Sequence, residues 1–178
     1  MRKLILVLLL VTGVAPSWAS VITTGDVDPG SAGRQPDLWV IQASDLHVGD
    51  EEFGTLNIDA GGVVSSIQGH IGFGADSAGE AMVTNEGSEW NNSNGLYVGY
   101  WGNGTLNIED GGVVSTKSRL FIAAKRGSTG TATVTGEGSL LSYNGHLSAG
   151  DYGDGTLNIE AGGMVNTTQG SPVNQVRT

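Results

Sequence analysis

Apolar and polar residues alternate in three stretches that share the sequence GTLNI, at positions 54–58, 104–108 and 155–159. Successive side chains of a strand point to opposite faces. The leucine and isoleucine of each copy therefore share one face, and the threonine and asparagine share the other. Each copy is followed by an acidic residue, a variable residue and two glycines. The pattern predicts three similar strands, each ended by a glycine-containing turn.

A finer period lies inside this one. Halfway between the copies, GEAMV (79–83) and GTATV (130–134) repeat the pattern with smaller residues, so the five leading glycines are spaced by 25, 25, 26 and 25 residues. This spacing predicts a unit of about 25 residues repeated five times. Equivalent residues of stacked units are expected to form two inward columns: Leu56, Ala81, Leu106, Ala132 and Leu157, and Ile58, Val83, Ile108, Val134 and Ile159.

Two further short apolar stretches precede each of these strands. The first is marked by Trp39 and Trp90, and the second lies at 46–49, 70–72, 96–99, 120–123 and 147–150. Three short strands and three turns per unit predict an all-β fold, a right-handed single-stranded parallel β-helix (β-solenoid) of about five coils. One corner is expected to need glycine, because a side chain would resist its backbone angles. The glycines assigned to it are Gly62, Gly87, Gly112, Gly138 and Gly163.

The pattern divides the chain into four parts. A basic start, an apolar run at 4–11 and small residues at Ser17 and Ala19 predict a secretory signal peptide at 1–19, and hence a secreted or cell-surface protein. We expect a lead-in or cap at 20–36, the solenoid at 37–165 and a polar tail at 166–178. The apolar run is shorter than the ~20 residues that span a bilayer. No membrane span is expected once the signal is removed.

Charge and cysteine content narrow the possible partners. The chain has 18 acidic and 8 basic residues, and loss of Arg2 and Lys3 with the signal changes the formal charge from −10 to −12. Nucleic acids and anionic lipids need a basic surface, so neither is expected as a partner. The chain has no cysteine, which excludes a disulfide scaffold and a thiolate metal site.

Two alternating motifs resemble a known repeat. The patterns L-x-V-G-x(n)-G-T-L-x-I-x-x-G-G-x-V and G-T-x-x-V-x-x-x-G-S-x-W, clearest at 96–114 and 79–90, are similar to the type V secretion and PEP-CTERM-associated repeat of autotransporter passengers and exported bacterial surface proteins. The resemblance covers about 37–165. It implies an exported β-solenoid with an adhesive, passenger or matrix role, and it indicates no particular ligand.

Titratable residues predict no metal or cofactor site. His47 and His70 share an outward position on adjacent coils, His146 lies one position away, and no third ligand follows at a defined spacing. Asp59, Glu109 and Glu160 share another position on alternate coils. They are expected to lie roughly 10 Å apart, too far to share a calcium ion.

An outward row of aromatic residues is the most suggestive chemical feature. It contains His47, His70, Tyr97, Phe121 and Ser148, and the next corner adds Phe53, Phe73, Tyr100, Trp101 and Tyr152. Such rows can stack on sugar rings, or can stabilise a solenoid by stacking on each other. The candidate residues for binding an extracellular polysaccharide or cell-surface component are His47, His70, Tyr97, Tyr100, Trp101 and Phe121.

Other function classes fit the sequence less well. β-Helical polysaccharide lyases and hydrolases need clustered acids with a base or an arginine. Here Lys117, Arg119, Lys125 and Arg126 fall in one coil without a matching carboxylate group. An ice-binding face of outward threonine and asparagine would be interrupted at Glu80 and Met82. The sequence favours an exported, non-catalytic structural or adhesive solenoid, with a polysaccharide-binding or polysaccharide-degrading β-helix as the alternative.

The two ends of the solenoid are expected to differ. A stack of strands exposes unpaired backbone groups at each end unless another segment covers them. Residues 20–36 can cover the first coil, whereas the polar residues after Val165 are poorly suited to cover the last. The C-terminal coil is expected to fray, to associate end to end with another copy, or to continue in a longer chain.

Overall fold

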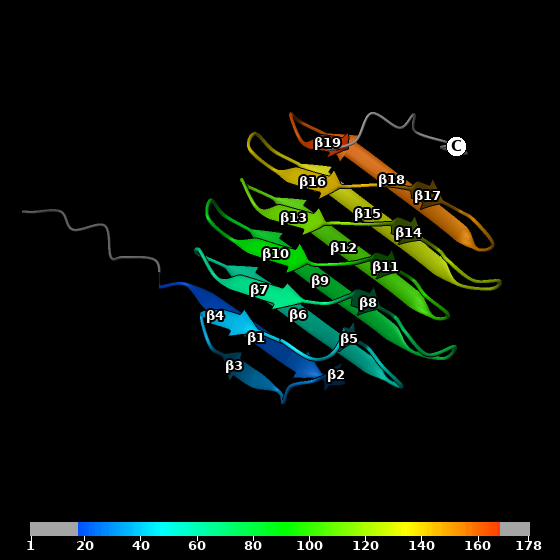
Figure 1. Cartoon of the computed structure of the whole chain (residues 1–178), viewed down its shortest axis with the longest axis horizontal. Coiled ribbons are helices and arrows are strands. Elements are labelled where there is room, and N and C mark those ends of the chain that lie inside the picture. The colour runs from blue at the N-terminus through cyan, green and yellow to red at the C-terminus, as the bar shows by residue number, and fades with distance from the viewer. Residues whose placement is uncertain (1–17, 168–178) are drawn as a thin grey trace, which may run out of the picture.

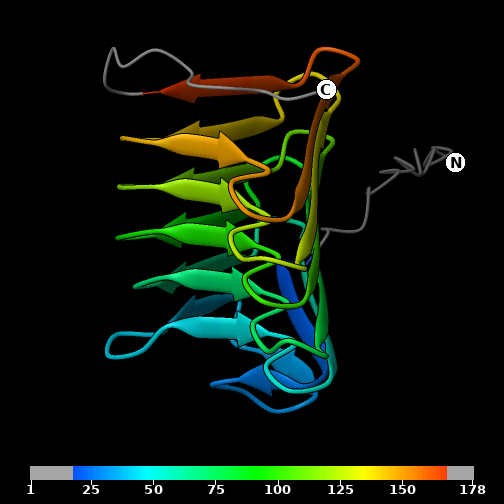
Figure 2. The ribbon, with the colours of Figure 1, turned by 90° about the vertical axis from the view of Figure 1, so that its right-hand side faces the viewer.

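The computed structural model describes residues 18–167 as strands and turns arranged in three sheets (Figure 1). Nearly all of the predicted signal peptide (1–19) and of the polar tail (166–178) lies outside the described residues. Within 18–167, no helix is long and apolar enough to cross a membrane. The chain forms a parallel β-solenoid of about five coils, which confirms the predicted fold class (Figure 2).

Each coil contributes one strand to each sheet. The tryptophan sheet contains β4 (Leu38–Val40), β7 (Val63–Ser66), β10 (Glu89–Asn92), β13 (Val113–Thr116), β16 (Leu140–Tyr143) and β19 (Met164–Thr167). The histidine sheet contains β5 (Leu46–Val48), β8 (Gly69–Ile71), β11 (Leu96–Val98), β14 (Leu120–Ile122) and β17 (Leu147–Ala149). The long sheet contains β6 (Phe53–Asp59), β9 (Ala78–Thr84), β12 (Asn103–Glu109), β15 (Thr129–Thr135) and β18 (Asp154–Glu160). Coil 1 is β4–β6, coil 2 is β7–β9, and so on to coil 5, β16–β18.

The predicted inward columns are confirmed by the strand register. Leu56 pairs with Ala81, which pairs with Leu106, and the column continues to Leu157. The tryptophan sheet holds a further column of Trp39, Val64, Trp90, Val114, Leu141 and Val165. In both columns the odd coils have the larger residues, so large and small side chains alternate and fill the interior. Trp90 and Leu106 are fully buried, and each such side chain stabilises the fold by roughly 1.5–3 kcal/mol.

Antiparallel strands cover the first coil. β1 (Ser20–Gly25) pairs with β6, β3 (Gly33–Gln35) pairs with β1, and β2 (Val27–Asp28) pairs with β5. Val21 extends the inward column that contains Ile58, and Thr23 extends the column that contains Leu56. Both residues are fully buried. The Thr23 hydroxyl donates to the Ser31 carbonyl at 2.7 Å. The apolar interior thus ends at a polar group whose hydrogen bond is made within the covering segment.

The glycine corner differs from the prediction. Val63 pairs with Glu89, and Glu89 pairs with Val113. Gly62 is therefore aligned with Ser88 and Gly112, so the predicted set of corner glycines mixes two neighbouring positions. The position that requires positive φ is one residue earlier, where all five coils have glycine with φ of 82–90°: Gly61, Gly87, Gly111, Gly138 and Gly162.

The neighbouring position has glycine for another reason. A Cβ on Gly112 would lie 2.2 Å from the Val83 carbonyl oxygen, so close approach of the previous coil excludes a side chain. The even coils place Ser88 and Ser139 here, and their hydroxyl oxygens accept hydrogen bonds from the Gly61 and Gly111 amides, at 3.1 and 3.0 Å.

Two of the three corners alternate in length between odd and even coils. From the histidine sheet to the long sheet, the odd coils use four residues (49–52, 99–102 and 150–153) and the even coils use six (72–77 and 123–128). After the long strand, the odd coils use three residues and the even coils use four. The structural repeat is therefore a pair of coils, which accounts for the 50-residue spacing of GTLNI.

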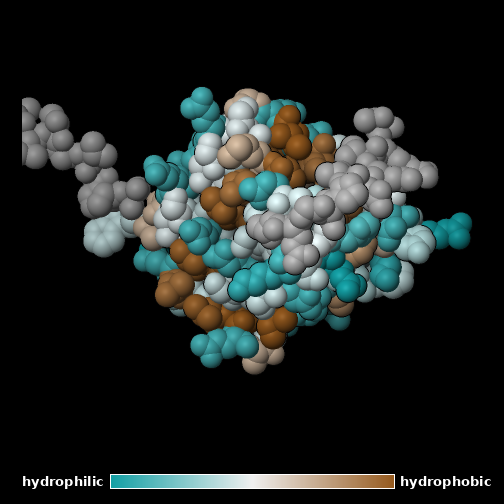
Figure 3. Space-filling view, turned by 45° about the horizontal axis from the view of Figure 1, so that its top comes forward, coloured by the Kyte–Doolittle hydropathy of each residue, from teal (hydrophilic) through white to brown (hydrophobic). Residues whose placement is uncertain are grey.

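The last described coil is open to solvent on its outer side. Ile159 and Met164 are 52% and 54% exposed, whereas Ile108 at the position equivalent to Ile159 is fully buried. Within the described residues, β17, β18 and β19 each end their sheet. Figure 3, turned so that this end comes forward, shows apolar side chains on it.

Candidate functional site

The predicted outward row lies on the histidine sheet, as its register shows. His47 pairs with His70, His70 with Tyr97, Tyr97 with Phe121 and Phe121 with Ser148. These residues alternate with buried ones such as Leu96 and Val98, so the strand period that fills the core also places the rings outside.

The rings are arranged as two stacks. One stack is His70, Tyr97 and Phe121, with centroids 4.7 and 5.6 Å apart and planes within 9° of parallel. The other is His47, Phe73 and Tyr100, with centroids 4.2 and 5.3 Å apart. The stacks meet edge to face, for example His70 on Tyr100 at 5.2 Å and 80°. Such pairs contribute about 0.5–1.5 kcal/mol each beyond their buried area.

Ring stacking decides which aromatic faces are available to a ligand. Tyr97 lies between His70 and Phe121, and Phe73 lies between His47 and Tyr100, so both faces of each central ring meet a neighbour. A sugar that stacks on a ring face would have to displace one of these neighbours. The geometry of Tyr97 and Phe73 therefore matches the structural role of an aromatic row.

One end of the row has a ring open to solvent. Trp101 is 45% exposed and meets Tyr100 edge to face at 6.0 Å. The Lys125 ammonium lies 5.2 Å from the Tyr100 ring centroid and 5.4 Å from that of Trp101. Phe53 and Tyr152, the other predicted corner aromatics, are 51% and 70% exposed. Trp101 with Lys125 offers both an exposed ring and a hydrogen-bond donor to a ligand.

A polar group adjoins the row on the first two coils. Asp45, His47 and His70 each offer one ligand-type atom, and these three atoms lie within 4.8 Å of one another. Asp45 and His47 are two residues apart and face the same way, and His70 occupies the His47 position on coil 2. The sequence reasoning missed Asp45 because it looked for a third ligand further along the chain. The spacing Asp45-x-His47, which puts both side chains on one face of an extended segment, was the sequence signal that could have identified Asp45 as a third ligand.

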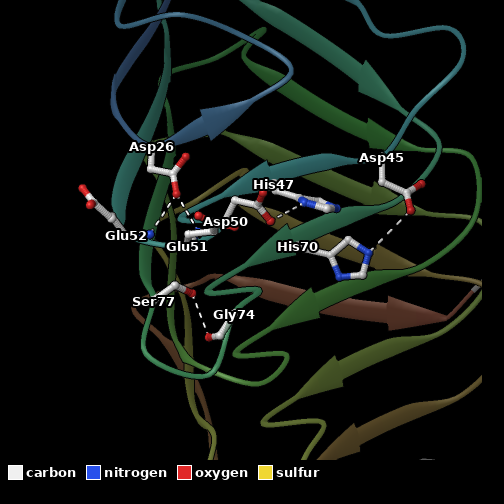
Figure 4. Close-up of polar contacts among 9 residues, drawn as sticks. All are labelled: Asp26, Asp45, His47, Asp50, Glu51, Glu52, His70, Gly74 and Ser77. Atoms are coloured by element: carbon white, nitrogen blue, oxygen red, sulfur yellow. Dashed lines mark hydrogen bonds and ion pairs between the residues drawn. The ribbon is translucent and has the colours of Figure 1, made fainter.

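Hydrogen bonds hold this group in place (Figure 4). His47 Nδ1 is 2.7 Å from Asp50 Oδ1, so the imidazole donates to a carboxylate. Gln68 donates to Asp45 through its backbone amide at 3.1 Å and its side-chain amide at 2.9 Å. His70 Nε2 lies 3.7 Å from Asp45 Oδ2, beyond ordinary hydrogen-bond distance. His70 Nδ1 is buried without a hydrogen-bond partner.

Burial determines the protonation state of His70. Its side chain is 6% exposed. Burial, followed by the charge of His47, lowers the pKa of His70 to about 4, despite the opposing effect of Asp45. His70 is therefore neutral near pH 7 and keeps a lone pair on one ring nitrogen. Burial also raises the pKa of the Tyr97 hydroxyl above 10.0, so Tyr97 is a neutral ring.

The other candidate groups are spread along the surface. Glu109 pairs with Thr84 and Thr135, and Glu160 follows after Thr135, as the predicted spacing of the acids requires. On the long sheet, the outward threonine column is interrupted by Glu80, and Met82 interrupts the neighbouring column. Thr55, Asn57, Glu80, Met82 and Asn107 line a shallow hollow there.

Comparison with known proteins adds no relative: the sequence matches no protein-family model, and no curated protein or solved structure is similar to it.

Proposed function

We propose that this chain is an exported structural or adhesive β-solenoid without a catalytic role. The observation that supports the proposal is the regularity of the coils. The five coil strands of the long sheet all have seven residues, and the five of the histidine sheet all have three. A β-helical enzyme places acids and bases together in a recess, and this usually alters the coils around it. The described coils differ mainly in the lengths of their corners.

The surface chemistry supports the same proposal. The formal charge of −10, or −12 once Arg2 and Lys3 are removed with the signal, favours solubility and disfavours binding to nucleic acids and anionic membranes. One basic residue of coil 4 has a role in the scaffold, because the Lys125 ammonium lies over the Tyr100 and Trp101 rings. Export rests on the apolar N-terminal run, and the adhesive or matrix role rests on the resemblance of the repeat to those of exported surface proteins.

The second candidate function is binding of an extracellular polysaccharide. Exposed Trp101 favours it, because an indole ring beside an ammonium group matches the apolar face and the hydroxyl groups of a sugar. In this version the stacked rings of Tyr97 and Phe121 hold the strands that position Trp101. Degradation of the polysaccharide is the least supported version, since the groups described beside Trp101 are a ring and an ammonium, Tyr100 and Lys125, whereas glycoside hydrolysis uses a pair of carboxyl groups.

A panel of polysaccharides separates these functions. The purified protein is incubated with each, and bound protein and released sugar ends are both measured. We expect no release of sugar ends from any of them, and turnover would overturn the non-catalytic proposal. Binding that is lost in Trp101→Ala but retained in Tyr152→Ala, an exposed ring away from the stacks, would establish the polysaccharide-binding version. Equal binding by both variants would exclude Trp101 as the contact.

A further inference from the structure

We propose that Asp45, His47 and His70 form a binding site for a zinc ion that links coil 1 to coil 2. Two imidazoles and one carboxylate are a common ligand set for Zn²⁺, which binds three protein groups and leaves a fourth position for water or another ligand. Calcium prefers six to eight oxygen ligands, and this group does not offer them. The inference is independent of an adhesive role.

The distances suit a zinc ion. Ligand atoms on a tetrahedral zinc with bonds of ~2.0–2.1 Å lie roughly 3.3 Å apart. His70 Nε2 and Asp45 Oδ2 are 3.7 Å apart, and the three ligand atoms lie within 4.8 Å of one another. Zinc coordination therefore requires these side chains to rotate toward one another from the positions seen here.

The hydrogen-bond pattern of the two histidines suits a metal as well. His47 Nδ1 donates to Asp50, which leaves Nε2, on the other side of the ring, as the metal ligand. His70 is buried, and its Nε2 is too far from Asp45 for a hydrogen bond, so a metal would give this nitrogen a partner.

Outer partners orient two of the three ligands. Asp50 holds the His47 ring through Nδ1, and this carboxylate–histidine pair is the usual outer support of a zinc ligand. Gln68 holds the Asp45 carboxylate with two hydrogen bonds. A carboxylate has enough lone pairs to accept these bonds and still bind a metal. The group is therefore a set of oriented side chains, with Asp45 and His47 partly open to solvent for entry of the ion.

Isothermal titration of metal-free protein without a histidine tag tests the site. We expect one Zn²⁺ to bind per chain, and Ca²⁺ to show no saturable binding. Asp45→Asn and His47→Gln, both at partly exposed positions, should each weaken zinc binding by at least ~10-fold, and Asp50→Asn by about 10–100-fold. His146→Gln, which changes the exposed histidine beside Phe121, is the matched control and should leave binding unchanged.

A second measurement distinguishes loss of zinc binding from loss of folding in the variants. Each variant is compared with the wild type by circular dichroism and thermal unfolding without metal, and only those with wild-type spectra are titrated. Zinc should raise the unfolding temperature of the wild type and of His146→Gln, because a ligand that binds the folded state stabilises it. The absence of saturable 1:1 zinc binding, or equal binding by Asp45→Asn and wild type, would overturn the proposal.

Discussion

At the scale of the residue, one backbone position shows how the fold tolerates a departure from glycine. The residue after each strand of the histidine sheet has positive φ in every coil, from 61 to 76°. Four coils use glycine there, and coil 4 uses Ala123. A left-handed conformation costs a residue with a Cβ roughly 1–2 kcal/mol. Ala123 is fully buried, so its methyl group recovers part of that cost.

Opposite substitutions at this position should have unequal effects. In Ala123→Gly, relief of backbone strain is offset by lost burial, about 0.8 kcal/mol, and by the added entropy of the unfolded chain, so stability should change by less than about 1 kcal/mol. In Gly99→Ala the new Cβ lies 2.0 Å from the Thr129 carbonyl oxygen, and we expect a loss of about 2–5 kcal/mol. Urea unfolding of both variants measures this, and losses of similar size would contradict the explanation.

At the scale of the element, the sequence predicted the strands of the solenoid better than its corners and its covering segment. Alternation around Leu106 and the equal spacing of the glycines determine both register and inward face, since a one-residue slip would expose every apolar side chain. The corner residues were misaligned at Ser88 and Ser139, because four-residue and three-residue corners alternate and nothing in the apolar pattern shows which coil has the extra residue.

The covering segment and the candidate site depended on contacts that no period reveals. β1 pairs antiparallel with β6, and Val21 lies opposite Ile58. Because β1 occurs once and is not part of the repeat, the period of the sequence does not predict this pairing. The row of rings followed from the register, but the stacking that occupies both faces of Tyr97 depends on side-chain rotation. Asp45 joined His70 through the same register, although it lies before β5 rather than in it.

Asp26 should make attachment of the covering segment sensitive to acid. Its carboxylate accepts the Glu51 and Glu52 amides at 2.6 and 2.8 Å, and the Glu52 bond, then the Glu51 bond, lower the pKa of Asp26 below 3.8. A lowered folded pKa stabilises the fold above pH ~3.8, and the contribution disappears as pH falls through the folded pKa.

A difference measurement isolates this effect. The stability of the wild type relative to Asp26→Asn should be constant between about pH 5 and 7 and should shrink below pH ~3.8. Asp76→Asn, at an exposed corner residue of coil 2, provides the control and should keep the acid dependence of the wild type. Urea unfolding at each pH gives the values. A constant difference down to pH 2 would show that the Asp26 carboxylate does not contribute.

At the scale of the whole molecule, the two ends of the described solenoid are unequal. The first coil is covered by β1, β2 and β3, whereas β17, β18 and β19 end their sheets within the described residues. The burial of apolar side chains differs between the ends in the same way. Val21 is fully buried at the covered end, whereas Ile159 is 52% exposed at the other end. Such an end favours fraying or end-to-end association, as we propose for this chain.

Hydrogen exchange should show this inequality directly. Amides of β18 should exchange faster than those of β12, which lies between β9 and β15, because an end strand opens without disturbing a second neighbour. The protein must be shown to be monomeric by sedimentation at the concentration used. If a monomer protects both strands equally, another part of the chain covers this end and the expected fraying does not occur.

The alternation of coils also sets the step by which such a protein can change length. Duplicating a pair of coils would preserve every large-on-small contact of the core, whereas duplicating one coil would place Leu106 against a second leucine and Trp90 against a second tryptophan. Growth or shortening by recombination is therefore restricted to multiples of two coils, about 9.6 Å of axial length. Related proteins with this repeat should therefore differ in length by an even number of coils.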